Sequence, residues 1–390
     1  MLLFFLTRCQ LSVKIWLVIA VPCYHPLLRV LVPGVNPETG KSLGQVVPFP
    51  PGLRPGIDPH VCSPYSWDRK FFVPCGSERG FPYQVIPCGK CLGCRMEYSR
   101  QWANRCLLEA EYHDSIYFVT VTYNDLHVRT SWYPDPATGE AQASLTLSKR
   151  DSQLFLKRLR KARPNDQIRF FMCGEYGSTT WRPHMHYILF GLHLDDLVCV
   201  GQRRGNNVYH SPLLERCWSE DLVTTDLFGK ECATPLAKDD PLRKIGFVEV
   251  MDFSWSAAAY VARYILKKQK GPEAQFYQDF GLVPPFTLMS RNPGIARQWY
   301  EDHPHIDEFE YINIKTEKGG KKFKSPKYYV DLFEEDYPEE SKIFKENRLR
   351  MTEAAMAAKL QRTDLSYLEY LAVEEDKLKR RTSSLLREEI

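Results

Sequence analysis

The sequence predicts an α+β protein built around an antiparallel sheet. Two observations support this prediction. Short segments rich in β-branched and aromatic residues alternate with segments of helical apolar spacing in the middle of the chain. The 390 residues, 44% apolar and 26% charged, have the composition of a globular protein with a large core. The net charge of +4 is small, so any affinity for nucleic acid must come from local basic patches.

The central elements are expected within residues 95–270. Helices are predicted at Arg95–His113, Ser148–Ala162 and Ser256–Lys270, and strands at Ser115–Tyr123, Gln167–Cys173, His184–Leu192 and Gly246–Met251. Ser148 and Asp151 have the spacing of a capping box, Tyr133–Glu140 is expected to form a loop, and Ser211–Trp218 is at most a short helix. The order resembles βαββαβ, the ferredoxin-like sandwich, whose sheet has helices on one face and the other face open for a site. The match is approximate, because the last predicted strand precedes the second long helix.

Four further segments flank this part. Residues 1–20 carry apolar runs broken by Arg8 and Lys14, too short for a membrane helix, and are expected to be a dispensable extension. Residues 21–94 are rich in Pro and Gly and predict an irregular arm. Residues 271–330 predict a basic accessory region, and residues 331–390 a charged, solvated helical tail. A narrow apolar seam in that tail is formed by Leu365, Leu368, Leu371 and Leu378.

A pair of histidines stands out in the predicted strand at His184–Leu192. Alternate side chains of a strand share a face, so His184 and His186 lie side by side, while Met185, Tyr187 and Leu189 face the core. Two imidazoles on one strand form half of a metal site. The alternative is that both are polar residues on a solvated sheet face.

The predicted helix at Ser256–Lys270 carries a second candidate group. Tyr260 and Tyr264 share one helical face, and Lys267 and Lys268 continue it. Small and aliphatic residues supply a separate face that can pack on the sheet: Ala257, Ala258, Val261, Ala262 and Ile265. The tyrosines and lysines can then point towards a ligand, whereas the alternative places the tyrosines in the core.

A cysteine cluster precedes the first predicted helix. Cys88, Cys91 and Cys94 are spaced by three, and Cys75 together with Cys23 or His25 could complete four zinc ligands. The alternative is a set of reduced, partly buried thiols. The other cysteines are scattered, which suits a reducing compartment better than a disulfide scaffold.

Together these segments resemble the HUH endonucleases that initiate rolling-circle DNA replication, in particular the replication initiators of gokushoviruses, small single-stranded DNA phages of the microvirus family. The resemblance covers about residues 21–330. It is carried by Cys88–Arg95, Tyr117–Tyr123, Gly174–Gly191, Ala257–Lys268 and Met289–Ile295. Their joint occurrence in this order is far more specific than any single motif.

The resemblance implies an HUH endonuclease domain over residues 95–270. His184 and His186 would bind Mg²⁺ or Mn²⁺, with Glu175 of the Gly174–Gly177 turn as third ligand. Tyr260 or Tyr264 would attack a phosphodiester, leaving a 5′-phosphotyrosyl link and a free 3′-OH, and the strand would later be rejoined. Lys267 and Lys268, with Arg263, would favour the phenolate or hold the phosphate.

The implied partners are single-stranded DNA, a replication origin and the host replication machinery, in the cytoplasm of a bacterial host and without a membrane. Basic residues of the helix at Ser148–Ala162 form a solvated face or lie along a phosphate backbone; they include Lys157, Arg158 and Lys161. The alternatives are a zinc-dependent DNA-binding regulator without nuclease activity and an HUH transposase or relaxase. No P-loop signature indicates a fused helicase.

Overall fold

The computed structural model describes the chain except for residues 1–22, 38–41, 63–71, 76–79, 178, 204, 221, 226–230, 235, 238–239, 255–256, 263–273, 305–310, 317–318 and 388–390. The predicted extension at residues 1–20 and most of the predicted helix at Ser256–Lys270 therefore lie outside the described residues. Within the described part, none of the helices combines the length and the apolar character needed to cross a membrane.

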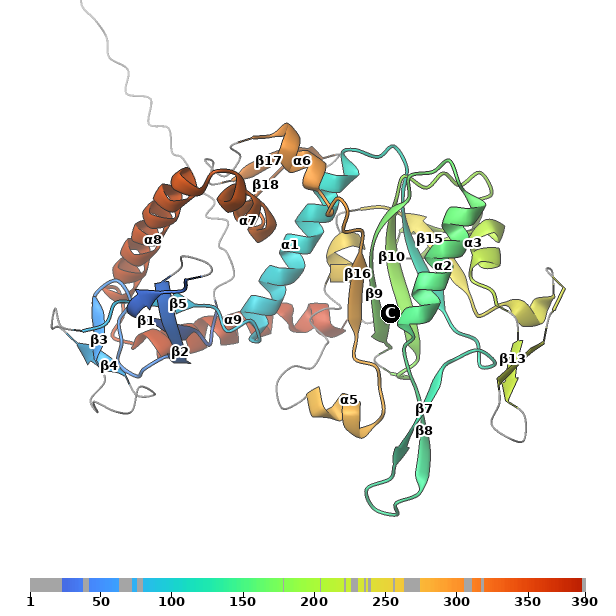
Figure 1. The fold of residues 1–390 in the computed structure, drawn as a ribbon, viewed down its shortest axis with the longest axis horizontal. Coiled ribbons are helices and arrows are strands. Elements are labelled where there is room, and N and C mark those ends of the chain that lie inside the picture. The colour runs from blue at the N-terminus through green and yellow to red at the C-terminus, as the bar shows by residue number, and fades with distance from the viewer. Residues whose placement is uncertain are drawn as a thin grey trace, which may run out of the picture.

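A seven-stranded antiparallel sheet forms the centre of the molecule (Figure 1), which confirms the α+β prediction. Its strand order is β11-β12-β15-β6-β10-β9-β16. The strands span Ile116–Thr122 (β6), Arg169–Tyr176 (β9), Pro183–Phe190 (β10), Val198–Arg203 (β11), Asn206–His210 (β12), Val248–Asp252 (β15) and Phe286–Met289 (β16). β16 lies in the region expected to be a separate accessory, but it is an edge strand of the main sheet.

One face of the sheet is covered by α2 (Lys149–Ala162) and α3 (Pro212–Cys217). Ser148 caps α2 as predicted, because its Oγ accepts a hydrogen bond from the Asp151 amide at 3.1 Å. The short helix expected at most over Ser211–Trp218 is present as α3, between β10 and β15. The chain order β6-α2-β9-β10-α3-β15 is therefore βαββαβ, and the approximate match in the sequence arose from taking a later helix as the second one.

The opposite face is also covered, which corrects the expectation that it is open. α1 (Leu92–Ala110), the helical residues 257–262 and α6 (Arg297–Asp302) pack there. Their side chains form one core with Phe118, Phe171 and Ile188 of the sheet. Figure 1 shows α1 and α2 on opposite sides of the strands.

The N-terminal arm is more regular than predicted. β1 (Leu27–Val35), β2 (Ser42–Pro48) and β5 (Tyr83–Ile86) form a three-stranded sheet in the order β2-β1-β5, and β3 (His60–Cys62) pairs with β4 (Val73–Cys75). Cys62 is disulfide-bonded, which the expectation of reduced, scattered cysteines did not foresee.

The C-terminal tail is docked on this arm rather than solvated. It comprises α7 (Lys327–Asp336), α8 (Pro338–Leu360) and α9 (Tyr367–Arg387). Leu371 is 2% exposed and packs in one core with Leu28 and Val30, and Leu368 and Leu378 pack against that core, whereas Leu365 is exposed. The blue strands and red helices therefore lie together in Figure 1.

The remaining elements are short. β7 (Thr130–Pro134) and β8 (Ala141–Leu145) form a hairpin where a loop was predicted over Tyr133–Glu140, so only its tip is a loop. The others are β13 (Leu222–Thr225) with β14 (Glu231–Thr234), the 3₁₀ turn η1 (Pro241–Arg243), α5 (Gln275–Asp279), and β17 (Ile312–Thr316) with β18 (Gly319–Phe323).

Candidate functional site

The β-ladder brings Glu175, His184 and His186 to one face of the sheet. His184 of β10 lies directly opposite Glu175 of β9, so the two side chains share a face, as does His186 two residues on. Glu175 is thus part of a strand and not of the turn in which it was expected. Met185 and its alternate neighbours Tyr187 and Leu189 are fully buried on the other face, which confirms the predicted alternation.

The three side chains converge on one carboxylate oxygen. Glu175 Oε1 lies 2.7 Å from His184 Nε2 and 3.3 Å from His186 Nε2. Glu175 is 1% and His186 4% exposed, while His184 is partly exposed, so the group is reached from the His184 side. Burial would raise the pKa of Glu175, but the hydrogen bonds from His184 and His186 outweigh it and the pKa is lowered. The carboxylate is therefore ionised.

The second nitrogen of each ring is held by a fixed partner. His184 Nδ1 lies 3.1 Å from the Arg182 carbonyl, which can only accept, so the proton is assigned to Nδ1. His186 Nδ1 lies 2.9 Å from Thr120 Oγ1. With both Nδ1 atoms donating, the neutral rings turn Nε2 lone pairs towards the Glu175 carboxylate. Two imidazole nitrogens and a carboxylate oxygen directed at one point fit a divalent cation such as Mn²⁺ or Mg²⁺.

Tyr260 lies beside this group. A helix begins soon after β15, where Ser254 Oγ accepts from the Ala257 amide at 3.1 Å. Ala258, Val261 and Ala262 are fully buried, as predicted for the face that packs on the sheet. The half-buried Tyr260 ring lies 5.5 Å from the His186 ring, centroid to centroid, in an edge-to-face arrangement. The other predicted members of this group lie outside the described residues: Arg263, Tyr264, Lys267 and Lys268.

The basic residues predicted to contact DNA on α2 are not brought to the histidines. Lys157, Arg158 and Lys161 lie on α2, which packs on the opposite face of the sheet. Arg158 is half-buried and its Nη1 donates to the Cys217 carbonyl of α3 at 3.3 Å, so part of its role is structural.

The sequence reading missed the residues that orient the histidines. Thr120 pairs with His186 across β6 and β10, and the Phe118 ring stacks on His186 at 5.5 Å. The Arg182 fork donates to the Tyr123 carbonyl at 2.9 and 3.0 Å and so fixes the turn before His184. The spacing of Phe118 and Thr120 on one strand face was a usable signal, but only the strand register shows which histidine they meet.

A second cluster gathers four thiols at the start of α1. The sulfurs of Cys23, Cys88, Cys91 and Cys94 all lie within 4.8 Å of one another. The Cys23 and Cys91 sulfurs are 3.9 Å apart, close to the roughly 3.8 Å separation that bonds of about 2.3 Å give around tetrahedral zinc. Four ligands are therefore present without the other predicted candidates: His25 bonds Glu375 at 3.1 Å, and the Cys75 side chain lies outside what the structure describes.

Backbone amides point at these sulfurs. Cys88 N donates to Cys23 Sγ at 3.2 Å, Cys91 N to Cys88 Sγ at 3.3 Å and Tyr24 N to Cys91 Sγ at 3.4 Å. Gly89 allows the tight turn between two of the ligands, because its φ of +71° is one that other residues adopt with strain. Hydrogen bonds from Cys23 and Cys94 lower the pKa of the Cys91 thiol. Donors that stabilise a thiolate suit a cluster of metal ligands.

The βαββαβ sheet and its buried Glu–His–His group define an α+β protein with the donor atoms for a divalent cation, and comparisons with known proteins identify the class. Residues 116–269 match the family described as replication-associated protein ORF2. This span runs from β6 into the segment that follows Tyr260, and includes Glu175, His184 and His186. The predicted resemblance to phage replication-associated proteins is confirmed.

The relatives are proteins of small phages. The chain is 28% identical over 306 residues to replication-associated protein ORF2 of Spiroplasma virus 4, covering 75% of this chain and 82% of the relative. It is 26% identical over 265 residues to replication-associated protein VP4 of Bdellovibrio phage phiMH2K, covering 65% and 69%. It is also 26% identical over 192 residues to replication-associated protein ORF4 of Chlamydia phage 1, covering 47% and 38%. No solved structure matches significantly.

Proposed function

We propose that this protein initiates rolling-circle replication by cutting single-stranded or origin DNA with a tyrosine, and later rejoins the strand. The observation that carries the proposal is the placement of Tyr260 against His186, within a Glu175–His184–His186 group that suits a divalent cation. All four residues lie in the span that matches the replication-associated family.

The strand order supports the same assignment. β15-β6-β10-β9, with α2 and α3 on one face, is the arrangement of a ferredoxin-like βαββαβ sheet. We assign this sheet as the palm of an HUH endonuclease. The histidine strand β10 is then central, and the helix after β15 crosses the face that carries the histidines.

The residues divide the chemistry between them. Glu175, His184 and His186 hold the ion, which when bound polarises a phosphodiester oxygen and offsets charge on phosphorus. The Tyr260 or Tyr264 phenol loses its proton and its oxygen bonds to phosphorus, while the bond from phosphorus to the 3′ oxygen breaks and that oxygen takes a proton. An ordinary phenol, with a pKa near 10, is a weak nucleophile at neutral pH. Arg263, Lys267 and Lys268 are therefore assigned to favouring the phenolate or binding the phosphate.

The products explain a role in replication. The free 3′-OH primes synthesis by host replication enzymes, and the phosphotyrosyl ester keeps the energy of the broken bond, so a later 3′-OH reseals the strand without a nucleotide cofactor. Two tyrosines allow one to hold the old end while the other cuts the regenerated origin. This activity would take place on phage DNA in the cytoplasm of the bacterial host.

We further propose that Cys23, Cys88, Cys91 and Cys94 hold a structural Zn²⁺. The four sulfur donors and the amides directed at them support this choice. Cys91 is the N-cap of α1, and Cys23 precedes β1. A bound zinc would therefore fasten the N-terminal arm to the helix that packs on the histidine face of the sheet.

The test is covalent capture of DNA. Incubation of the full chain with circular single-stranded phage DNA and Mn²⁺ should give a protein–DNA adduct that protease destroys. His186→Ala should give none, whereas His193→Ala, an exposed histidine remote from the group, should behave as the parent does. Retention of DNA without any covalent adduct would instead favour a DNA-binding regulator and contradict the proposal.

A further inference from the structure

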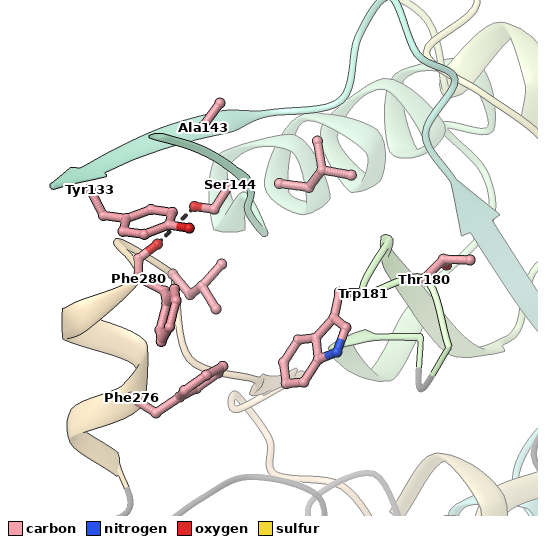
Figure 2. A pocket seen from close by; sticks show the side chains of 9 residues that line it. Tyr133, Ala143, Ser144, Thr180, Trp181, Phe276 and Phe280 are labelled. Carbon is pink, nitrogen blue, oxygen red and sulfur yellow. Dashed lines mark hydrogen bonds between the residues drawn. The ribbon is translucent and has the colours of Figure 1, made fainter. Parts of the chain in front are cut away.

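An aromatic cavity lies beyond the end of the sheet near the histidines. The β7–β8 hairpin, the turn between β9 and β10, and α5 enclose about 270 Å³. Figure 2 shows Trp181 facing Phe276 across this space, with Tyr133 and Phe280 on the hairpin side. The Ser144 hydroxyl, also in the wall, donates to the Phe280 carbonyl at 2.8 Å and joins hairpin to helix.

The rings form a continuous row. Centroid separations are 6.0 Å from Tyr176 to Trp181, 5.4 Å from Trp181 to Phe276, 4.7 Å from Phe276 to Phe280 and 4.9 Å from Phe280 to Tyr133. Trp181 is 49% exposed, which is unusual for the largest apolar side chain unless it meets a ligand. Tyr176 directly follows the candidate metal ligand Glu175, so the row begins at the metal group.

The turn that presents Trp181 is held firmly. Trp181 has a φ of +53°, a conformation that a bulky residue adopts only when its surroundings impose it. Its amide donates to the Gly177 carbonyl at 3.0 Å, and the Gly177 amide donates to the Arg182 carbonyl at 3.0 Å. Such local strain is concentrated at functional positions, and here it turns an indole ring outwards.

The cavity shares its walls with the proposed catalytic group. The turn that carries Thr180 and Trp181 joins the Glu175 strand to the His184 strand. A carbon at the Cβ position of Gly177 would lie 3.5 Å from Thr180 Oγ1 and 3.8 Å from His184 Cε1, so cavity and metal group flank the same glycine. α5, which supplies Phe276 and Phe280, is the next described helix after the one that carries Tyr260.

We propose that this cavity binds unpaired bases of the DNA strand next to the phosphate that is cut, by stacking them on Trp181 and Phe276. The inference rests on the proposed function, which places a phosphodiester at the histidines. A base attached beside that phosphate can reach the aromatic row without leaving the strand. Planar apolar rings suit bases of any sequence, and bases within a duplex are not free to enter.

The test compares two DNA probes that differ only in their bases. Fluorescent oligothymidylate and an abasic oligomer of equal length and charge are titrated against the full chain without added divalent cation, so no cleavage occurs. The parent should bind the base-bearing probe about tenfold more tightly. Trp181→Leu, which keeps apolar volume but not the ring, should lose this preference, and Trp181→Phe should keep most of it. Trp132→Leu is the control, because Trp132 is 66% exposed next to Tyr133 but does not line the cavity.

Several results would overturn the inference. One is equal affinity of the parent for both probes; another is a base preference that survives in a folded Trp181→Leu protein, which would make the row hairpin packing only. If Trp181→Leu does not fold, Phe276→Leu provides the same comparison on the other wall. Because binding is measured without cleavage, a base preference without covalent adduct contradicts the nuclease alone, and an adduct without base preference contradicts the cavity alone.

Discussion

The two candidate metal centres bring their donor atoms equally close together, but different forces hold them there. Glu175, His184 and His186 lie on two neighbouring strands, and the β-ladder between packed cores fixes their spacing. Cys23 lies 65 residues from Cys88 in the chain, and these thiols come from a loop, a turn and a helix start beside a small sheet. The first group exists without an ion, whereas in the second the ion itself is part of what joins the segments.

This difference separates chemistry from stability. Removing the ion from the strand group should stop catalysis and leave the fold intact, because no element depends on the ion for its position. Removing the ion from the thiol group should loosen the arm and α9, because a structural zinc contributes directly to the folding free energy. The predictions that follow test this separation, from the largest expected effect to the smallest.

The largest effect is expected at the histidines. His184→Ala and His186→Ala should each lower metal-dependent adduct formation by more than about 100-fold, since the loss of a ligand removes the ion that the reaction needs. Glu175→Ala should also weaken Mn²⁺ binding, measured by titration calorimetry. Thermal melting should be close to that of the parent for the histidine variants. Normal cleavage by either of them would exclude this group as the catalytic centre.

The tyrosines come next, and they sharpen what belongs to the strand group. A first cut needs one nucleophile, so Tyr260→Phe and Tyr264→Phe should each retain part of the covalent cleavage. Release of unit-length circles needs both and should be poor in either single variant, as seen by gel analysis of the DNA products. Tyr112→Phe, at an exposed tyrosine bonded to Asp302, should release circles normally.

The cysteines should show the opposite pattern. Cys88→Ser and Cys91→Ser should lower the melting temperature by more than about 5 °C, and the zinc content of the purified protein should fall from about one per chain. Cys199→Ser provides the matched control, because Cys199 is an exposed free thiol on β11. Zinc-free parent protein with unchanged melting would show that the cluster is a set of buried thiols.

The smallest effect concerns the group that orients His186. Thr120→Val removes the hydroxyl beside His186 Nδ1 and keeps the side-chain shape, so Mn²⁺ affinity should fall about tenfold. Thr122→Val, on the same strand face opposite His184, is the control for altering β6. Equal affinities in the two variants would mean that ring orientation comes from the Phe118 stack instead.

The sequence predicted what depends on local period and missed what depends on distant partners. The two faces of the strand around His184 follow from alternation, and Ser148 caps its helix by a contact three residues away. By contrast, the apolar seam at Leu371 meets Leu28 and Val30, more than 300 residues earlier in the chain, and no local pattern reveals that contact.

The arm and the hairpin were misread for a related reason. Short strands among prolines and glycines, such as β1 and β2, show no sustained period, so pairing over β5 is what defines them. At the metal group, Glu175 was chosen by the resemblance, but its position opposite His184 follows from the register of β9 and β10. Trp181 carried no signal, because its exposure depends on a turn whose conformation is set by Gly177 and Arg182.

The most direct test of the central claim is to locate the protein–DNA bond. The adduct formed with circular single-stranded DNA and Mn²⁺ is digested with nuclease and protease, and the nucleotide-bearing peptide is identified by mass spectrometry. We predict a 5′-phosphate ester on Tyr260 or Tyr264, and no such peptide from the Tyr260→Phe/Tyr264→Phe double variant. A nucleotide on any other residue, or an adduct that persists in the double variant, would contradict the assignment of the nucleophile to the helix beside His186.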